Sequence, residues 1–73
     1  MKEENKMTKN EMINNFVEFV NKDYLHIDNY CKNINDAYDN IEIDDYEWCV
    51  ETFCDNNNIN CHILYNLINE IRK

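Results

Sequence analysis

Three cysteines and a histidine in the second half of the chain have side chains that bind zinc or attack electrophiles. They are Cys49, Cys54, Cys61 and His62. Their spacing fits neither chemistry well, because no C-x-x-C or H-x-x-x-H pair places two ligands on one helix face. An acidic protein also raises the pKa of a thiol, whereas a nucleophilic cysteine needs a lowered one. We therefore expect these cysteines and Cys31 to be reduced and to fill apolar space, with a disulfide or a zinc site as alternatives.

Other catalytic arrangements lack their residues. The chain contains no Ser for a serine triad and no Gly for a phosphate-binding loop. The acidic segment 39–45 lacks the glycine and the ligand spacing of a calcium-binding loop. A domain of 73 residues is also expected to be too small for a substrate cleft of the usual volume. We predict that the protein is not an enzyme and that it uses no metal and no cofactor.

Carboxylates are distributed unevenly along the chain. The formal net charge is −8, to which residues 1–27 contribute −1, residues 28–55 contribute −8 and residues 56–73 contribute +1. This charge disfavours direct binding to nucleic acid or to an anionic membrane, because both need Lys and Arg to contact phosphates. It favours a basic surface on another protein as the partner.

One tryptophan lies within the acidic segment. On a helical projection Trp48 falls beside Glu51 and Asp55, and Glu47 precedes them at the i, i+4, i+8 spacing of one helix side. Carboxylates in this arrangement would steer a basic partner, and the indole would anchor it. A competing explanation is that the acids only keep the protein soluble. The predicted partner-binding residues are Asp36, Asp39, Glu42, Asp44, Asp45, Glu47, Trp48, Glu51 and Asp55.

The first two helices that position these residues are predicted from caps and apolar periodicity. Thr8 and Glu11 form the T-x-x-E capping box of a helix over residues 9–22. Its apolar residues, from Met12 to Val20, cover an arc of roughly 160°, and Asn21 falls on the polar side. Asp28 is the predicted N-cap of a second helix, whose apolar stripe runs from residue 30 to residue 38.

Two further helices are expected in the second half of the chain. Asp44 or Asp45 would cap the third, and the run 55–58 would end it. Asn60 would cap the fourth. Its apolar stripe consists of Ile63, Leu64, Leu67, Ile68 and Ile71. The short segments 24–27 and 41–43 alternate in polarity, and a minor two-stranded pairing between them is an alternative.

The elements together predict an all-α fold, a small compact bundle of three to four short helices. Residues 8–73 would form a single helical domain, and residues 1–7 would be a frayed N-terminus. Helices joined by Asn and Asp loops suit a chain without Gly or Pro better than tight β-turns do. No stretch approaches the ~20 apolar residues of a membrane span, and no signal-peptide pattern is present. We therefore expect a cytoplasmic protein.

In size, acidity and composition the chain is similar to the small single-domain inhibitors of phages and other mobile elements. These include anti-CRISPR proteins and DNA mimics. The similarity covers no particular residues. It implies an inhibitor that blocks the basic nucleic-acid-binding surface of a host defence enzyme. Two alternatives remain open: a helical homodimerisation or assembly module, because the apolar arc of residues 9–22 is wide, and a small zinc-binding regulator.

Overall fold

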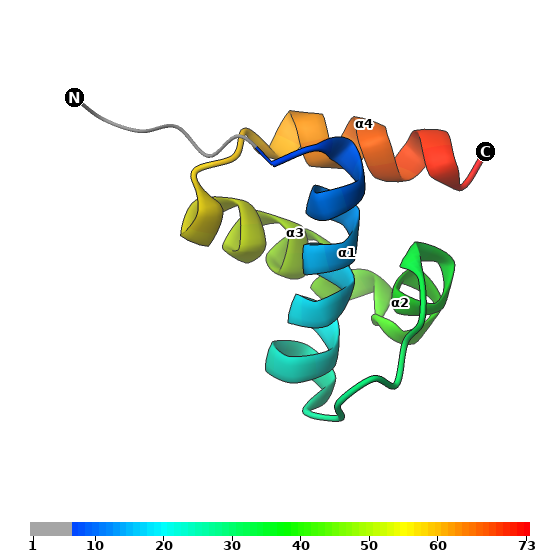
Figure 1. The fold of residues 1–73 in the computed structure, drawn as a ribbon. Coiled ribbons are helices and arrows are strands. Elements are labelled where there is room, and N and C mark those ends of the chain that lie inside the picture. The colour runs from blue at the N-terminus through cyan, green and yellow to red at the C-terminus, as the bar shows by residue number, and fades with distance from the viewer. Residues whose placement is uncertain (1–6) are drawn as a thin grey trace.

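The computed structural model describes residues 7–73, and these residues fold into helices joined by short loops (Figure 1). They contain no strand, so the predicted all-α class is confirmed and the segments 24–27 and 41–43 do not pair as strands. No helix among them is long and apolar enough to cross a membrane. The elements are α1 (Lys9–Phe19), the π-helix η1 (Val20–Leu25), α2 (Ile34–Asn40), α3 (Ile43–Asn57) and α4 (Cys61–Ile71).

Helix α1 is the centre of the packing. It contacts α2, α3 and α4, and α3 also packs against α4 (Figure 1). The buried hydrophobic residues of all four α-helices form one core. Phe16 is fully buried in it and meets Phe53 of α3 edge to face, with ring centroids 5.5 Å apart. Burying a phenylalanine contributes about 1.5–3 kcal/mol, which is a large share of the stability of so small a domain.

Local sequence signals set several helix ends as predicted. The Thr8 hydroxyl accepts the Glu11 N–H, and the Glu11 carboxylate accepts the Thr8 N–H, which completes the capping box. The Asn60 side chain caps α4 by accepting the His62 N–H. Asn58 ends α3 in the left-handed conformation, with φ of 56°. Glycine usually takes that position, so Asn replaces it in this glycine-free chain.

The predicted start of the second helix is wrong. Asp28 caps no helix, because α2 begins only at Ile34 with Asn33 as its N-cap. Asn21, expected on the polar side of the first helix, is buried instead. Its side chain accepts the Cys31 N–H and donates to the Cys31 carbonyl oxygen, at 2.8 and 3.1 Å. These two bonds satisfy both backbone groups of Cys31 outside a helix, and Tyr30 remains exposed.

The predicted cap of the third helix is also wrong. Helix α3 begins two or three residues earlier than expected, with Glu42 at the N-cap position and without a hydrogen bond from the Glu42 side chain. The Tyr24 hydroxyl accepts the Glu42 N–H at 3.3 Å and donates to the Asp45 carboxylate at 2.6 Å. A side chain from η1 thus takes the role that a local cap usually fills.

The expected frayed terminus falls mostly on residues 1–6, which lie outside the described residues. Met7 is described, and it packs against the core. Its sulfur accepts a hydrogen bond from the Asn15 side chain at 3.0 Å.

Candidate protein-binding surface

Helix α3 separates an apolar face from an acidic one. Its buried side chains are Cys49, Val50, Phe53 and Cys54. The side facing solvent carries four exposed carboxylates and one exposed indole, which we call the acidic stripe: Asp44, Glu47, Trp48, Glu51 and Asp55. At 100° per residue these five positions fall within an arc of about 100°. The structure therefore brings together five of the nine residues predicted from sequence.

The acidic stripe is long and carries uncompensated charge. Asp44 and Asp55 are eleven residues apart, or about 16 Å along the helix axis. Four carboxylates over that length give roughly one charge per 5 Å, compared with one per about 3.4 Å of axis for a DNA strand. Within residues 7–73 the ion pairs join Lys22 to Glu18 and Arg72 to Asp39, so that none of them involves the acidic stripe.

Trp48 is half exposed in the middle of the acidic stripe, with 51% of its surface accessible. Its ring is 6.3 Å from that of Phe19, which is partly buried at the end of α1. Phe19 in turn meets the buried Phe53 edge to face at 5.7 Å. The indole thus packs against aromatic side chains, and about half of its residue's surface stays accessible to a partner.

The other four predicted residues lie outside the acidic stripe. The Asp45 carboxylate accepts the Tyr24 hydroxyl, and the Asp36 carboxylate accepts the backbone N–H of Lys32. Asp39 lies 4.0 Å from the Arg72 guanidinium. Glu42 is exposed at the start of α3. Asp36 and Asp45 therefore accept hydrogen bonds within the molecule and Asp39 approaches a cation of α4's end, contacts that the sequence did not reveal.

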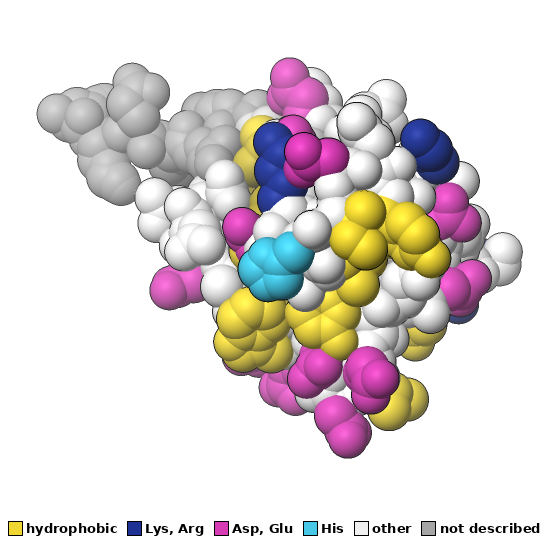
Figure 2. Space-filling view, turned by 90° about the horizontal axis from the view of Figure 1, so that it is seen from below, with side chains coloured by type: hydrophobic (Ala, Val, Ile, Leu, Met, Phe, Trp, Pro, Cys, Tyr) yellow, Lys and Arg dark blue, Asp and Glu magenta, His cyan; other side chains and the backbone are white. Residues whose placement is uncertain are grey.

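Figure 2 shows how the Asp and Glu side chains are distributed over the face that is seen from below. A group of Asp and Glu side chains occupies the lower edge of that face, next to hydrophobic side chains. Further carboxylates lie apart from this group, near the upper and right margins. The face seen in this view therefore carries acidic side chains in several places, with one group of them gathered at its lower edge.

The helix dipole explains only some of these acids. Asp44 and Asp45 lie in the first turn of α3, where negative charge is favourable. Asp55 lies near the opposite end, where negative charge is unfavourable, and no basic residue occupies the last turn. Glu51 and Asp55 also repel each other at the i, i+4 spacing. Helix stability therefore does not account for the second half of the acidic stripe.

The charge of the acidic stripe also reaches helix α4. The pKa of the Tyr65 hydroxyl is raised, first by partial burial and then by the nearby carboxylates of Glu47 and Glu51. Both effects disfavour the tyrosinate, because a negative phenolate is poorly solvated there and is repelled by the acids. The charge of the acidic stripe is therefore felt at Tyr65 on α4.

The chain matches no protein-family model, no curated protein and no solved structure with significance.

The cysteines are separate thiols in the structure, and none forms a disulfide. The pKa of Cys49 and of Cys54 is raised from 9.0 to about 11, and burial is the largest cause. Burial is also the largest cause of the raised pKa of Cys31. Thiols with a raised pKa stay protonated near neutral pH, and a protonated thiol is a poor nucleophile. Within residues 7–73 no three His, Cys, Asp or Glu side chains converge as metal ligands would.

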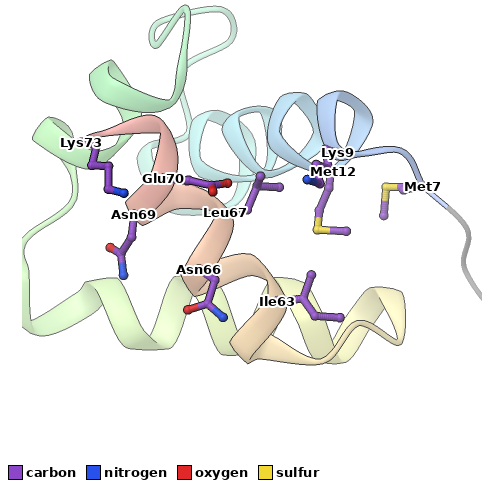
Figure 3. Close-up of a pocket in the computed structure, with 9 residues that line it drawn as sticks. All are labelled: Met7, Lys9, Met12, Ile63, Asn66, Leu67, Asn69, Glu70 and Lys73. Carbon is purple, nitrogen blue, oxygen red and sulfur yellow. The ribbon is translucent and has the colours of Figure 1, made fainter.

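A second surface feature is a groove between α1 and α4, of about 630 Å³ (Figure 3). Its apolar side chains are Met7, Met12, Ile63 and Leu67, and its charged ones are Lys9, Glu70 and Lys73. Asn66 and Asn69 complete its lining. We call it the α1–α4 groove. Its volume lies within the usual range of ligand sites, so the expectation that this domain is too small for a cleft is wrong.

Sequence periodicity placed Ile63 on the apolar side of its helix but did not show that this side lacks a cover. Ile63 is 54% exposed and Ile71 is 43% exposed, although Leu64 and Ile68 of the same helix are fully buried. The crossing of α1 over α4 decides which of these residues is covered. One sign of the groove was present in the sequence. The apolar arc predicted for residues 9–22 is wider than one neighbouring helix can cover.

Proposed function

We propose that the protein is an inhibitor that binds the basic, nucleic-acid-binding surface of another protein through the acidic stripe of α3. The single observation that carries the proposal is the row of Asp44, Glu47, Glu51 and Asp55 around the exposed Trp48, without a paired cation among the described residues. The expected target is a host defence enzyme, and the expected source is a phage or another mobile element.

The charge of the acidic stripe supports this class of partner. Carboxylates spaced along a rigid helix can occupy the positions that phosphates take in the basic groove of a nucleic-acid-binding protein. They also raise the rate at which the two proteins associate. The net charge of −8 makes nucleic acid itself an unfavourable partner. If the acids served only to keep the protein soluble, their exposure would be explained. The exposed tryptophan among them would not be explained.

The position of Trp48 supports the same surface. Binding hot spots are enriched in tryptophan and lie near the centre of an interface, surrounded by polar residues that exclude water. Trp48 has two of the four carboxylates on each side of it along the sequence. Its contact with Phe19 holds the ring in place, which lowers the entropy lost on binding.

The test is inhibition of purified nucleic-acid-binding defence enzymes, including RNA-guided nucleases, by the wild-type protein and by a charge-reversed variant. The variant carries Glu47→Lys, Glu51→Lys and Asp55→Lys. We expect the wild type to compete with nucleic acid for at least one enzyme, and we expect the variant to lose that competition. Circular dichroism checks that the variant keeps its helices.

The matched control carries Glu18→Lys, Asp23→Lys and Asp28→Lys, which change the net charge equally but lie in α1, η1 and the following loop. The control should inhibit as the wild type does. Equal loss in both variants would mean that overall charge, and not the acidic stripe, causes inhibition. Unchanged inhibition by the folded α3 variant would exclude the acidic stripe.

A further inference from the structure

Helices α3 and α4 are joined by a short turn that has a cysteine on each side of it. Cys54 lies in the last turn of α3, and Cys61 is the first residue of α4. The backbone carbonyl of Cys54 accepts the N–H of Asn58, which is left-handed, and the N–H of Ile59 at 2.9 Å. The chain therefore reverses its direction within residues 58–60, and α4 packs back against α3.

The two cysteines share one hollow of the surface, with a volume of about 420 Å³. Its lining residues are Glu51, Thr52, Cys54, Asp55, Ile59 and Cys61. Cys54 belongs to the buried core, and Cys61 is partly buried and packs against that core. Burial first, and then the charge of Cys61, raise the pKa of Cys54 to about 11. Coulombic influence falls with distance, so this effect agrees with two thiols that lie close together.

The other two cysteines are placed apart from this pair. Cys49 precedes Cys54 by five residues on the same helix, so their Cα atoms are at least about 7.5 Å apart along the axis, too far for a disulfide. Cys31 lies before α2, where the Asn21 side chain binds both of its backbone groups. Burial raises the pKa of Cys31 and of Cys49, and the second cause is an aspartate in each case.

From the shared hollow and the reversal of the chain between them, we infer that Cys54 and Cys61 are a redox modification site, which a small-molecule disulfide converts into an intramolecular disulfide. Both are thiols in the structure, which therefore represents the reduced state. The disulfide joins α3 to α4 beside Glu51 and Asp55, which line the same hollow and belong to the acidic stripe. The inference does not rest on the proposed inhibition, because the bond forms or fails without a partner protein.

The modification is a thiol–disulfide exchange in two steps. Cys61, the least buried of the four cysteines, loses its proton to water and attacks one sulfur of the small disulfide, whose S–S bond breaks. The departing thiolate takes up a proton. Cys54 then loses its proton, attacks the sulfur of Cys61 and releases the second small thiol. Two electrons thus pass from the two cysteines to the small disulfide, which becomes two thiols.

The raised pKa of Cys54 slows only the second of these steps. That step is intramolecular, so it gains from the proximity of the two sulfur atoms. The order of attack follows from burial, because a small disulfide reaches Cys61 before it reaches the buried Cys54.

The experiment treats the folded, reduced chain with hydroxyethyl disulfide, an uncharged oxidant that an acidic surface does not repel. Unreacted thiols are alkylated, and cleavage after glutamate leaves Cys54 and Cys61 on the fragment 52–70 and Cys49 on the fragment 48–51. We expect the alkylated thiols to fall from four to two, with the fragment 52–70 unalkylated and two hydrogen atoms lighter. The urea midpoint should rise on oxidation and return with dithiothreitol, because the bond constrains the unfolded chain.

Cys61→Ala is the test variant and Cys31→Ala is the matched control, because each leaves three thiols. The control should form the same bond as the wild type, whereas Cys61→Ala should form none. Circular dichroism checks that both variants keep their helices, and the fragment analysis of the wild type decides even if one does not. Oxidation of the wild type in urea should give several pairings, including those of Cys49, because the fold no longer selects one.

Four alkylated thiols after prolonged oxidation, a stable mixed disulfide on Cys61 or a bond between two chains would overturn the inference. Each of these outcomes would show that the sulfur atoms of Cys54 and Cys61 do not meet in the folded chain. The same mixture of pairings with and without urea would overturn it too. None of these results bears on the acidic stripe, and a failure of enzyme inhibition leaves the disulfide result unchanged.

Discussion

The acidic stripe of α3 and the α1–α4 groove are two exposed surfaces built from opposite chemistry on one small core. The acidic stripe has four carboxylates and one indole, while the groove has four apolar side chains and charges of both signs. Charge acts over a distance that salt controls, whereas apolar area acts only on contact. One small core thus presents two separate surfaces, one whose interactions would depend on charge and one whose interactions would depend on apolar contact.

Removing the shared core should abolish both surfaces and is the largest effect that we expect. Phe16→Ala removes a fully buried ring that meets Phe53 and Phe19, at a cost of about 3–5 kcal/mol. This equals the whole stability expected for a core of this size, so the variant should be largely unfolded. Circular dichroism with urea titration measures it.

The control for this prediction is Ile43→Ala, at the most exposed large hydrophobic residue, which should change stability by less than about 0.5 kcal/mol. A Phe16→Ala protein that keeps the wild-type helicity and unfolding midpoint would show that the two surfaces do not depend on one core.

Removing Trp48 should affect one surface only. Trp48→Ala should weaken binding to the inhibited enzyme by about 2 kcal/mol or more, a loss of roughly 30-fold in affinity. Isothermal titration with the enzyme measures the loss. If Trp48→Ala lowered the unfolding temperature as strongly as Phe16→Ala does, its role would be structural.

Alkaline pH should weaken the core beneath both surfaces. Burial raises the pKa of Cys49 and Cys54 from 9.0 to about 11 and that of Tyr46 from 10.0 to about 12. Above pH 9 the unfolded chain therefore releases protons that the folded chain retains. Stability is complete below about pH 9 and falls as the pH rises toward 11, by about 1–3 kcal/mol for each fully shifted group.

Urea midpoints measured between pH 8 and pH 11 test this dependence. The variant Cys49→Ala with Cys54→Ala should begin from a lower stability but lose less of it over the same range. A double variant with the same alkaline slope as the wild type would show that these thiols do not cause the loss.

Local signals in the sequence were sufficient for some elements and not for others. The capping box of Thr8 and Glu11 and the Asn60 cap act within one turn of helix, so sequence spacing alone predicted them. The acidic side of α3 followed in the same way from the 100° step of a helix. These features depend on neighbours along the chain and not on the tertiary fold.

The remaining features depend on contacts between distant residues. Asn21 binds Cys31 across ten positions, and Tyr24 binds Glu42 across eighteen, so propensity gave the wrong start for two helices. The pairing of Asp39 with Arg72 joins α2 to the end of α4. The exposure of Ile63 depends on where α1 crosses α4. A helical projection contains none of this information.

The proposed contact through charge is tested by the affinity of the wild-type protein for an enzyme identified in the inhibition assay, at about 0.1 M and about 1 M salt. Over this range the screening length falls from about 10 Å to about 3 Å. We expect at least a tenfold loss of affinity for the wild type and little further loss for the variant with Glu47, Glu51 and Asp55 replaced by lysine. Affinity that stays constant or rises with salt would contradict it.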